Sequence, residues 1–187
     1  MTFLTQLWLP IVVSAVLVFI ASSVLHMVLT AWHKSDYRQL PNEDVVRAAL
    51  RAANAAPAQY MTPWCDGMKD LKTPEMQKKF EEGPIAFITL RPSGMPTMGP
   101  MLGMWFAFTL VVSAIAAYIA QKTLAPEANF LQVCRVVGAL AFLAYTGGSV
   151  TQGIWMGRPW GSVAKDVVDG AIYAVITACT FAWLWPR

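Results

Sequence analysis

Four segments of this sequence are each long and apolar enough to cross the hydrocarbon core of a bilayer, which takes about 20 apolar residues. They are residues 8–32, 102–120, 130–152 and 162–185. Hydrophobic residues make up 56% of the chain and charged residues only 13%, against roughly 45–50% and about 25% in ordinary soluble domains. The sequence therefore predicts an all-α membrane protein with four transmembrane helices, built as a single integral membrane domain over residues 1–187.

A long polar insert, residues 33–101, joins the first span to the second, whereas short links join the other spans and favour antiparallel neighbours. Within the insert, residues 41–54 predict a helix with acidic residues in its first turn. Residues 73–83 predict a second helix, with Thr73 as its N-cap and a glycine at its end. Residues 84–91 are apolar and β-branched and predict one short strand. We expect this insert to lie against the membrane surface.

The distribution of basic residues predicts the orientation. Of the 14 Lys and Arg, only Lys122, Arg135 and Arg187 lie on the side of the membrane that carries both predicted termini. Cytoplasmic loops collect positive charge, so the insert is predicted to be cytoplasmic and the two termini to face outside. The net charge of +3 is small and forms no basic patch, so nucleic acid is not an expected partner.

Small residues recur at helical contact spacing in the fourth span, at Gly170, Ala174, Ala178 and Ala182. Close packing of small residues drives helix association in lipid. This face is predicted to pack inside the bundle, or against a protein partner or a second copy of the chain.

Both histidines lie near the end of the first span. His26 lies within it, and Asp169 lies at a matching depth in the fourth span, so we predict a polar contact between them. This pair is either a proton site or a contact that fixes helix packing. Lys165 is expected to reach Asp169 at i,i+4, and His33 is expected among the lipid headgroups.

Cofactor binding by His26 is an alternative. His26 and His33 are two helical turns, about 10 Å, apart on one helix, so they are not expected to hold one haem iron within a monomer. His26 alone remains a candidate ligand for haem b. The alternative is a hydrogen-bonded histidine inside the bundle.

Methionines spaced by three residues give a candidate Cu(I) site at Met95, Met98 and Met101, followed by Met104. The prolines between them favour polyproline II, which has three residues per turn, and Cys65 adds sulfur on the same side of the membrane. Thioether and thiolate sulfur suit Cu(I). A flexible apolar loop is the other interpretation. The polar stretch 145–153 predicts interhelical hydrogen bonds or a small cavity.

No metal-protease, phosphate-loop or nucleophile-elbow motif occurs in the sequence. We therefore expect a non-enzymatic protein, an accessory or structural subunit of a larger membrane complex. The alternatives are a haem- or copper-binding membrane protein, using His26 or the methionine stretch, and a small proton-linked transporter, using His26 and Asp169.

Three stretches, HKSDYRQLPNEDVVRAAL, APAQYMTPWC and IWMGRPWGSVAKDVVDGAIYAVITACTFAWLWP, resemble a family of small four-helix bacterial inner-membrane proteins of unknown function. The resemblance implies a bacterial inner membrane, in which the orientation predicted from the basic residues makes the termini periplasmic and the insert 33–101 cytoplasmic. It implies no activity and assigns no functional residue.

Overall fold

The computed structural model describes residues 2–186 and divides the chain into two compact units. The membrane unit comprises Met1–Arg38 and Thr97–Arg187, and the insert unit comprises Gln39–Pro96. Each unit is described by itself.

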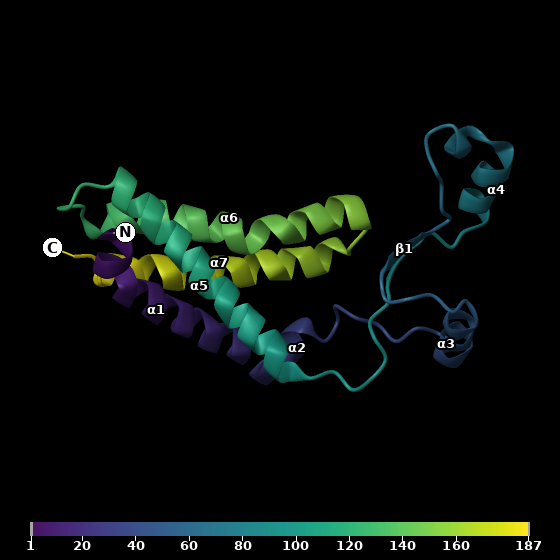
Figure 1. The fold of residues 1–187 in the computed structure, drawn as a ribbon, viewed down its shortest axis with the longest axis horizontal. Coiled ribbons are helices and arrows are strands. Elements are labelled where there is room, and N and C mark those ends of the chain that lie inside the picture. Colours follow the sequence, from purple (N-terminus) through teal and green to yellow (C-terminus); the bar gives the residue numbers. More distant parts are fainter. Residues whose placement is uncertain (1, 187) are drawn as a thin grey trace. The chain divides into compact units, whose positions relative to one another are not determined.

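Four long helices form the membrane unit and lie side by side (Figure 1). They are α1 (Thr2–Ser23), α5 (Met98–Thr123), α6 (Phe130–Met156) and α7 (Trp160–Trp183). All four are long and apolar enough to cross a membrane, which confirms the predicted number of spans. The first candidate span runs from Leu4 to Val28 rather than over residues 8–32.

The first span does not end as a regular α-helix. After α1 the chain continues as a π-helical turn, η1 (Val24–Val28), and the next residue, Leu29, has φ −87° and ψ 48°. A short helix, α2 (Thr30–His33), follows this break. The wide turn and the break change the direction of the chain, so residues seven apart no longer keep the spacing of a continuous α-helix.

The two ends of the bundle differ in chemistry. Where α1 begins and α7 ends, the core is apolar and includes Leu7, Ala120, Val133 and Phe181, each at most 1% exposed. The opposite end, where α1 ends and α7 begins, buries polar side chains instead, among them Asp169 at 3% exposure.

The small-residue face of α7 is used inside the bundle. Ala174, Ala178 and Ala182 are buried, and so is Gly170. A Cβ atom at Gly170 would lie 2.5 Å from Cγ2 of Thr146 on α6. The prediction that this face of α7 packs inside the bundle is therefore confirmed. Atoms of α6 lie against Gly170 and Ala178, and a protein partner or second copy that binds through this helix stays a prediction.

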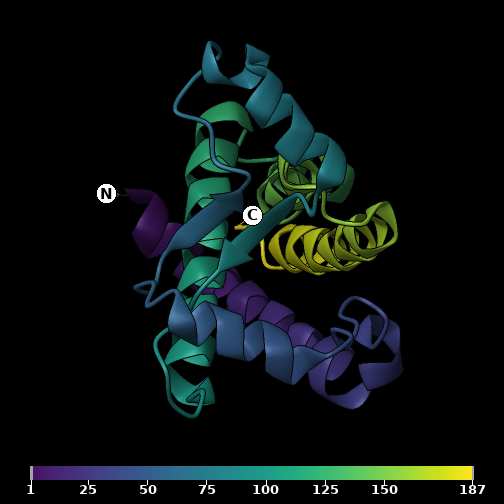
Figure 2. The same cartoon turned by 90° about the vertical axis from the view of Figure 1, so that its right-hand side faces the viewer.

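The insert unit contains two helices, one 3-10 turn and a two-stranded sheet. In chain order these are α3 (Glu43–Ala52), β1 (Gln59–Thr62), η2 (Asp70–Lys72), α4 (Pro74–Glu82) and β2 (Ala86–Thr89). The strands pair antiparallel, with Gln59 opposite Thr89 and Thr62 opposite Ala86 (Figure 2). The prediction of a single strand is therefore incomplete, because β1 supplies its partner.

The boundaries of α4 agree with the sequence-based expectation. Oγ1 of Thr73 accepts a hydrogen bond from the backbone N–H of Met76 at 3.3 Å, and Gly83 follows the helix with φ +60°. Across the insert unit, residues 39–96, no residue is buried. The insert is therefore organised by local hydrogen bonds and strand pairing rather than by a core of its own.

Candidate functional site

The imidazole of His33 lies between two carboxylates. Its Nδ1 is 2.6 Å from Oδ2 of Asp36, and its Nε2 is 2.8 Å from Oδ2 of Asp169. Ionised carboxylate oxygens are acceptors, so with both Asp36 and Asp169 ionised both ring nitrogens serve as donors and the ring is an imidazolium. The His33 side chain is 17% exposed and the two carboxylates are 6% and 5% exposed, which places this ion triad largely out of solvent.

Further donors complete the triad. Nε1–H of Trp32 donates to Oδ1 of Asp169 at 2.9 Å. Nζ of Lys165 donates to Oδ1 of Asp36 at 2.9 Å and to Oγ of Ser35 at 2.7 Å. These hydrogen bonds connect the end of α2 to the first turns of α7.

These contacts shift two pKa values in opposite directions. Burial alone would lower the pKa of His33, but the hydrogen bonds and negative charges of Asp36 and Asp169 raise it above its ordinary value. Burial would raise the pKa of Asp36, yet donors from His33, Lys165 and Ser162 lower it to about 2. Each charge therefore stabilises the charged form of its neighbour.

The ring of His26 lies against His33 but makes its own hydrogen bond to the backbone. Its Nδ1 is 3.0 Å from the backbone oxygen of Ser22. Because that carbonyl only accepts, Nδ1 carries a proton, and in the neutral ring Nε2 is then an acceptor. The His26 ring stacks on His33 with centroids 4.3 Å apart and planes at 15°. Nε1–H of Trp105 donates to the hydroxyl of Ser22 at 2.8 Å.

The sequence-based interpretation of this region needs three corrections. His26 does come close to Asp169, but the hydrogen bond to that carboxylate comes from His33. His33 pairs with two carboxylates, and it lies against His26 rather than about 10 Å away, because the π-turn and the break at Leu29 redirect the chain. Lys165 pairs with Asp36 instead of Asp169.

His26, His33 and Asp169 each offer a metal-ligating atom, and these atoms lie within 4.8 Å of one another. The donor set nevertheless suits a shared proton better than a metal ion. Both nitrogens of His33 already face carboxylates. The in-plane lone pairs of two stacked rings also lie in nearly parallel, separate planes and so do not converge on one point. A metal would require the ring of His26 to turn out of the stack.

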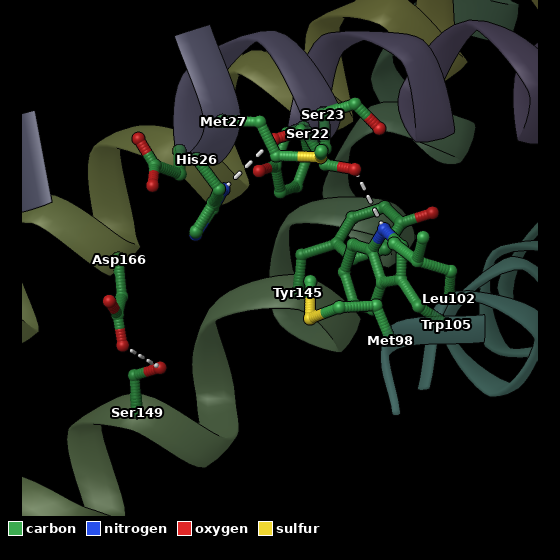
Figure 3. A pocket seen from close by; sticks show the side chains of 12 residues that line it. Ser22, Ser23, His26, Met27, Met98, Leu102, Trp105, Tyr145, Ser149 and Asp166 are labelled. Atoms are coloured by element: carbon green, nitrogen blue, oxygen red, sulfur yellow. Dashed lines mark hydrogen bonds between the residues drawn. The ribbon is translucent and has the colours of Figure 1, made fainter. Parts of the chain in front are cut away.

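A cavity of about 370 Å³ adjoins the triad within the membrane unit (Figure 3). Its polar lining comes from His26, Asp166 and Asp169 with several serines, and its apolar lining from Trp105 and neighbouring side chains. The complete lining is Ser22, Ser23, His26, Met27, Met98, Leu102, Trp105, Tyr145, Ser149, Asp166, Asp169 and Tyr173. The candidates for such a lining in the polar stretch of α6 are Thr146, Ser149, Thr151 and Gln152. Of these only Ser149 lines the cavity, and Tyr145 of the same stretch joins it.

The second carboxylate of the cavity has its own partners. Asp166 accepts a hydrogen bond from Oγ of Ser149 at 2.8 Å, drawn in Figure 3. It also forms a two-pronged ion pair with the guanidinium of Arg158, in which Nη2 lies 3.1 Å from Oδ1. The sequence signal for this pair was an arginine in the short link just before α7.

Aromatic rings close one side of the cavity. Trp105 lies 6.2 Å from Tyr145 and 6.0 Å from Tyr173, and the two tyrosine rings are 5.5 Å apart. Tyr173 is 4% exposed, and its hydroxyl has no hydrogen-bond partner among the described residues. A buried polar atom without a partner is costly and calls for an explanation.

The sulfur residues of the candidate copper site are divided between the two units. Met95 and Cys65 belong to the insert unit, whereas Met98 and Met101 lie in the first turn of α5. The predicted polyproline II conformation is wrong from Met98 onward, because the chain is α-helical there. Met98, Met101 and Met104 are brought onto one element, and Met98 lines the cavity.

Comparison with family models, with curated proteins and with solved structures finds no match to this chain. The resemblance to a family of four-helix inner-membrane proteins therefore stays a prediction.

Proposed function

We propose that this membrane protein is a small proton-linked transporter in which His33 and Asp169 form the proton site. The observation that carries the proposal is the imidazole of His33, which is held between Asp36 and Asp169, together with the cavity in the membrane unit that Asp169 lines. This revises the sequence-based alternative, which assigned the role to His26 and Asp169.

The cost of burying these charges supports a functional role. Ionisable side chains inside a membrane bundle are expensive, and many belong to ion or proton pathways. A contact that only fastened two helices would need no charge, because apolar packing of similar volume is often as stable as a buried ion pair. Here several charged side chains at one end of the bundle meet beside an open space.

Asp169 gives the proton a route. Its carboxylate accepts from Nε2 of His33 and also lines the cavity. His26 stacks on His33 and lines the same cavity, and in its neutral ring Nε2 is an acceptor because Nδ1 faces the carbonyl of Ser22. In the proposed cycle the proton passes from Nε2 of His33 to Asp169 and from there into the cavity. The solute occupies the cavity when the proton has left.

The proton site is tested first by nitrogen NMR of the histidines in protein reconstituted into nanodiscs. The chain has only two histidines, so a His26→Gln variant assigns both sets of signals. We expect both nitrogens of His33 to be protonated at neutral pH, with a pKa that falls in Asp169→Asn. A His33 that titrates at its ordinary value, and is insensitive to Asp169, would contradict the proposal.

Transport is tested in proteoliposomes that contain a trapped pH indicator, to which small solutes are added one at a time. Proton movement should accompany at least one solute with the wild-type protein and be lost in His33→Gln. Asp44→Asn, on the exposed face of α3, is the matched control. Wild-type flux in His33→Gln would refute the assignment, provided that circular dichroism shows both variants folded.

A role as a non-enzymatic accessory subunit is the second candidate, and the insert unit supports it. No residue of 39–96 is buried, while large apolar side chains such as Trp64, Met68 and Phe87 are 67%, 71% and 49% exposed. Such a surface suits docking to a larger complex. Gentle extraction followed by mass spectrometry of the native particle tests it, since a particle that contains only this chain would exclude fixed partners.

The proposed location is a bacterial inner membrane, with periplasmic termini and the insert 33–101 in the cytoplasm. The three free cysteines allow a direct test, because Cys65 lies in the insert unit whereas Cys134 and Cys179 lie within spans. A membrane-impermeant maleimide should label Cys65 in inverted vesicles but not in intact spheroplasts. Cys65→Ser controls for labelling at the other two. The opposite pattern would reverse the orientation.

A further inference from the structure

We infer that the solute exchanged against the proton is a small organic cation, an ammonium group with apolar substituents, which binds in the cavity beside Asp169. This inference rests on the proposed function and names its substrate class. It is carried by the charge of the cavity lining and by the chemistry of the walls.

The lining of the cavity is acidic. It includes the carboxylates of Asp166 and Asp169 and, among the described residues, no Lys or Arg. The cations that balance these acids, Arg158 and His33, are not part of the lining. A bound anion would therefore meet carboxylates, whereas a bound cation would meet opposite charge.

The charge count around His33 is balanced only while the ring is protonated. The groups that contact it are His26 from η1, Asp36 after α2 and Asp169 on α7. Lys165 on α7 pairs with Asp36, Arg158 pairs with Asp166 and interacts with Asp36, and Tyr173 interacts with Asp169. Asp36, Asp166 and Asp169 oppose His33, Lys165 and Arg158. Loss of the His33 proton leaves one uncompensated negative charge, which a monovalent cation restores to neutrality.

The walls of the cavity suit the substituents of such a cation. Trp105, Tyr145 and Tyr173 form a cluster of rings with centroids about 6 Å apart or less, and aromatic faces attract ammonium groups within about 6 Å. Met27, Met98 and Leu102 offer apolar contacts beside them. The volume of about 370 Å³ falls within the range of small-molecule sites, roughly 300–1,000 Å³.

Three polar groups in the lining remain available to a ligand. Nε2 of His26 is an acceptor in the neutral ring, and the buried hydroxyls of Tyr145 and Tyr173 have no partner among the described residues. An ammonium that carries an N–H group can donate to the imidazole. A quaternary ammonium lacks this donor and depends on the rings and carboxylates alone, so the two kinds of cation distinguish these contributions.

The test is calorimetric titration of the wild-type protein in nanodiscs with benzyltrimethylammonium, with benzylamine as the N–H-bearing probe and benzenesulfonate as the anionic control. Because one proton leaves as one cation binds, affinity should tighten about tenfold per pH unit below the pKa of His33 and level off above it. Titrations in buffers of different ionisation enthalpy should report one proton released per cation.

Asp169→Asn should weaken cation binding by at least about tenfold, and Asp44→Asn should leave it unchanged. The wild-type pH dependence needs no variant, so it remains decisive if Asp169→Asn does not fold.

Affinity equal at about pH 5.5 and pH 8.5, or preferential binding of benzenesulfonate, would overturn the inference. A His33 that titrates as expected by NMR, in a protein that binds no cation, would overturn this inference and leave the proton site standing. A His33 that titrates at its ordinary pKa and is insensitive to Asp169 would contradict the proposed function as well.

Discussion

Two ion pairs of equal length show how differently the two units use charge. In the membrane unit, Nε2 of His33 lies 2.8 Å from Asp169, with side chains 17% and 5% exposed. In the insert unit, Nζ of Lys79 also lies 2.8 Å from Glu75, with side chains 52% and 81% exposed. An exposed pair is screened by water and contributes little, whereas a buried charge that loses its partner is strongly destabilising. The distance between two charges therefore does not by itself determine how much the pair contributes to stability, because that contribution depends on how buried the two side chains are.

The largest expected difference between the units comes from removing one buried carboxylate. Asp169→Asn keeps the size of the side chain but leaves His33 and Lys165 with less negative charge than they need. We expect a loss of about 3 kcal/mol in stability, measured by denaturant unfolding in detergent and followed by circular dichroism. Asp44→Asn, whose side chain is 99% exposed in the insert, should change nothing. Equal losses of stability in the two variants would contradict the expected difference between a buried and an exposed carboxylate.

Packing in the membrane unit gives the next effect. A Cβ at Gly170 would lie 2.5 Å from Cγ2 of Thr146, whereas a Cβ at Gly148 meets no atom within 4 Å. Gly170→Ala should therefore destabilise the bundle by up to about 3 kcal/mol by overpacking the contact between α6 and α7. Gly148→Ala on α6 is the matched control and should retain wild-type stability. If both variants unfold alike, the contact is not close-packed.

The triad should make the stability of the membrane unit depend on pH in two directions. His33 has a raised pKa, so its contribution is complete below its ordinary value of 6.5 and is lost as pH rises through the raised value. Asp36 has its pKa lowered from 3.8 to about 2, so its contribution, about 2 kcal/mol, is complete above pH 3.8 and is lost as pH falls through about 2.

Melting temperatures recorded across this range should therefore be highest between the two limits. His33→Gln should flatten the alkaline side of the profile, and Asp36→Asn should flatten the acid side. A wild-type melting temperature that rises above neutral pH would contradict the assigned charge states. The insert should show no such profile, because its charged pairs are exposed.

The sequence predicted the parts of the molecule that depend on local pattern. Hydropathy located four spans, and the signals at Thr73 and Gly83 located α4. The proximity of His26 to Asp169 also followed from matching depths in two antiparallel helices. These features depend on residues close in sequence or on the thickness of the membrane, and both are readable without a structure.

The participation of His33 could not be predicted, because its position depends on a π-turn and a break at Leu29. No proline or glycine lies between Val24 and His33, so the sequence does not indicate that break. The interlocked contacts of Asp36 and Lys165 were missed for the same reason, since they follow from where α2 is directed. A tyrosine and a threonine, both common in strands, were the available signals for β1, but its pairing with β2 spans more than twenty residues.

The smallest expected effect tests whether the insert unit depends on local interactions. Thr73→Ala removes the hydroxyl that accepts from the N–H of Met76, and loss of an N-cap costs about 1 kcal/mol. The effect should appear only in the insert, as faster hydrogen exchange in α4 measured by mass spectrometry. Exchange in α6 and α7 and the melting of the bundle should stay unchanged. Because residues 39–96 bury no side chain, nothing in that unit would compensate for a frayed helix. An exchange rate in α4 that does not respond to Thr73→Ala would show that something other than its own cap holds this helix.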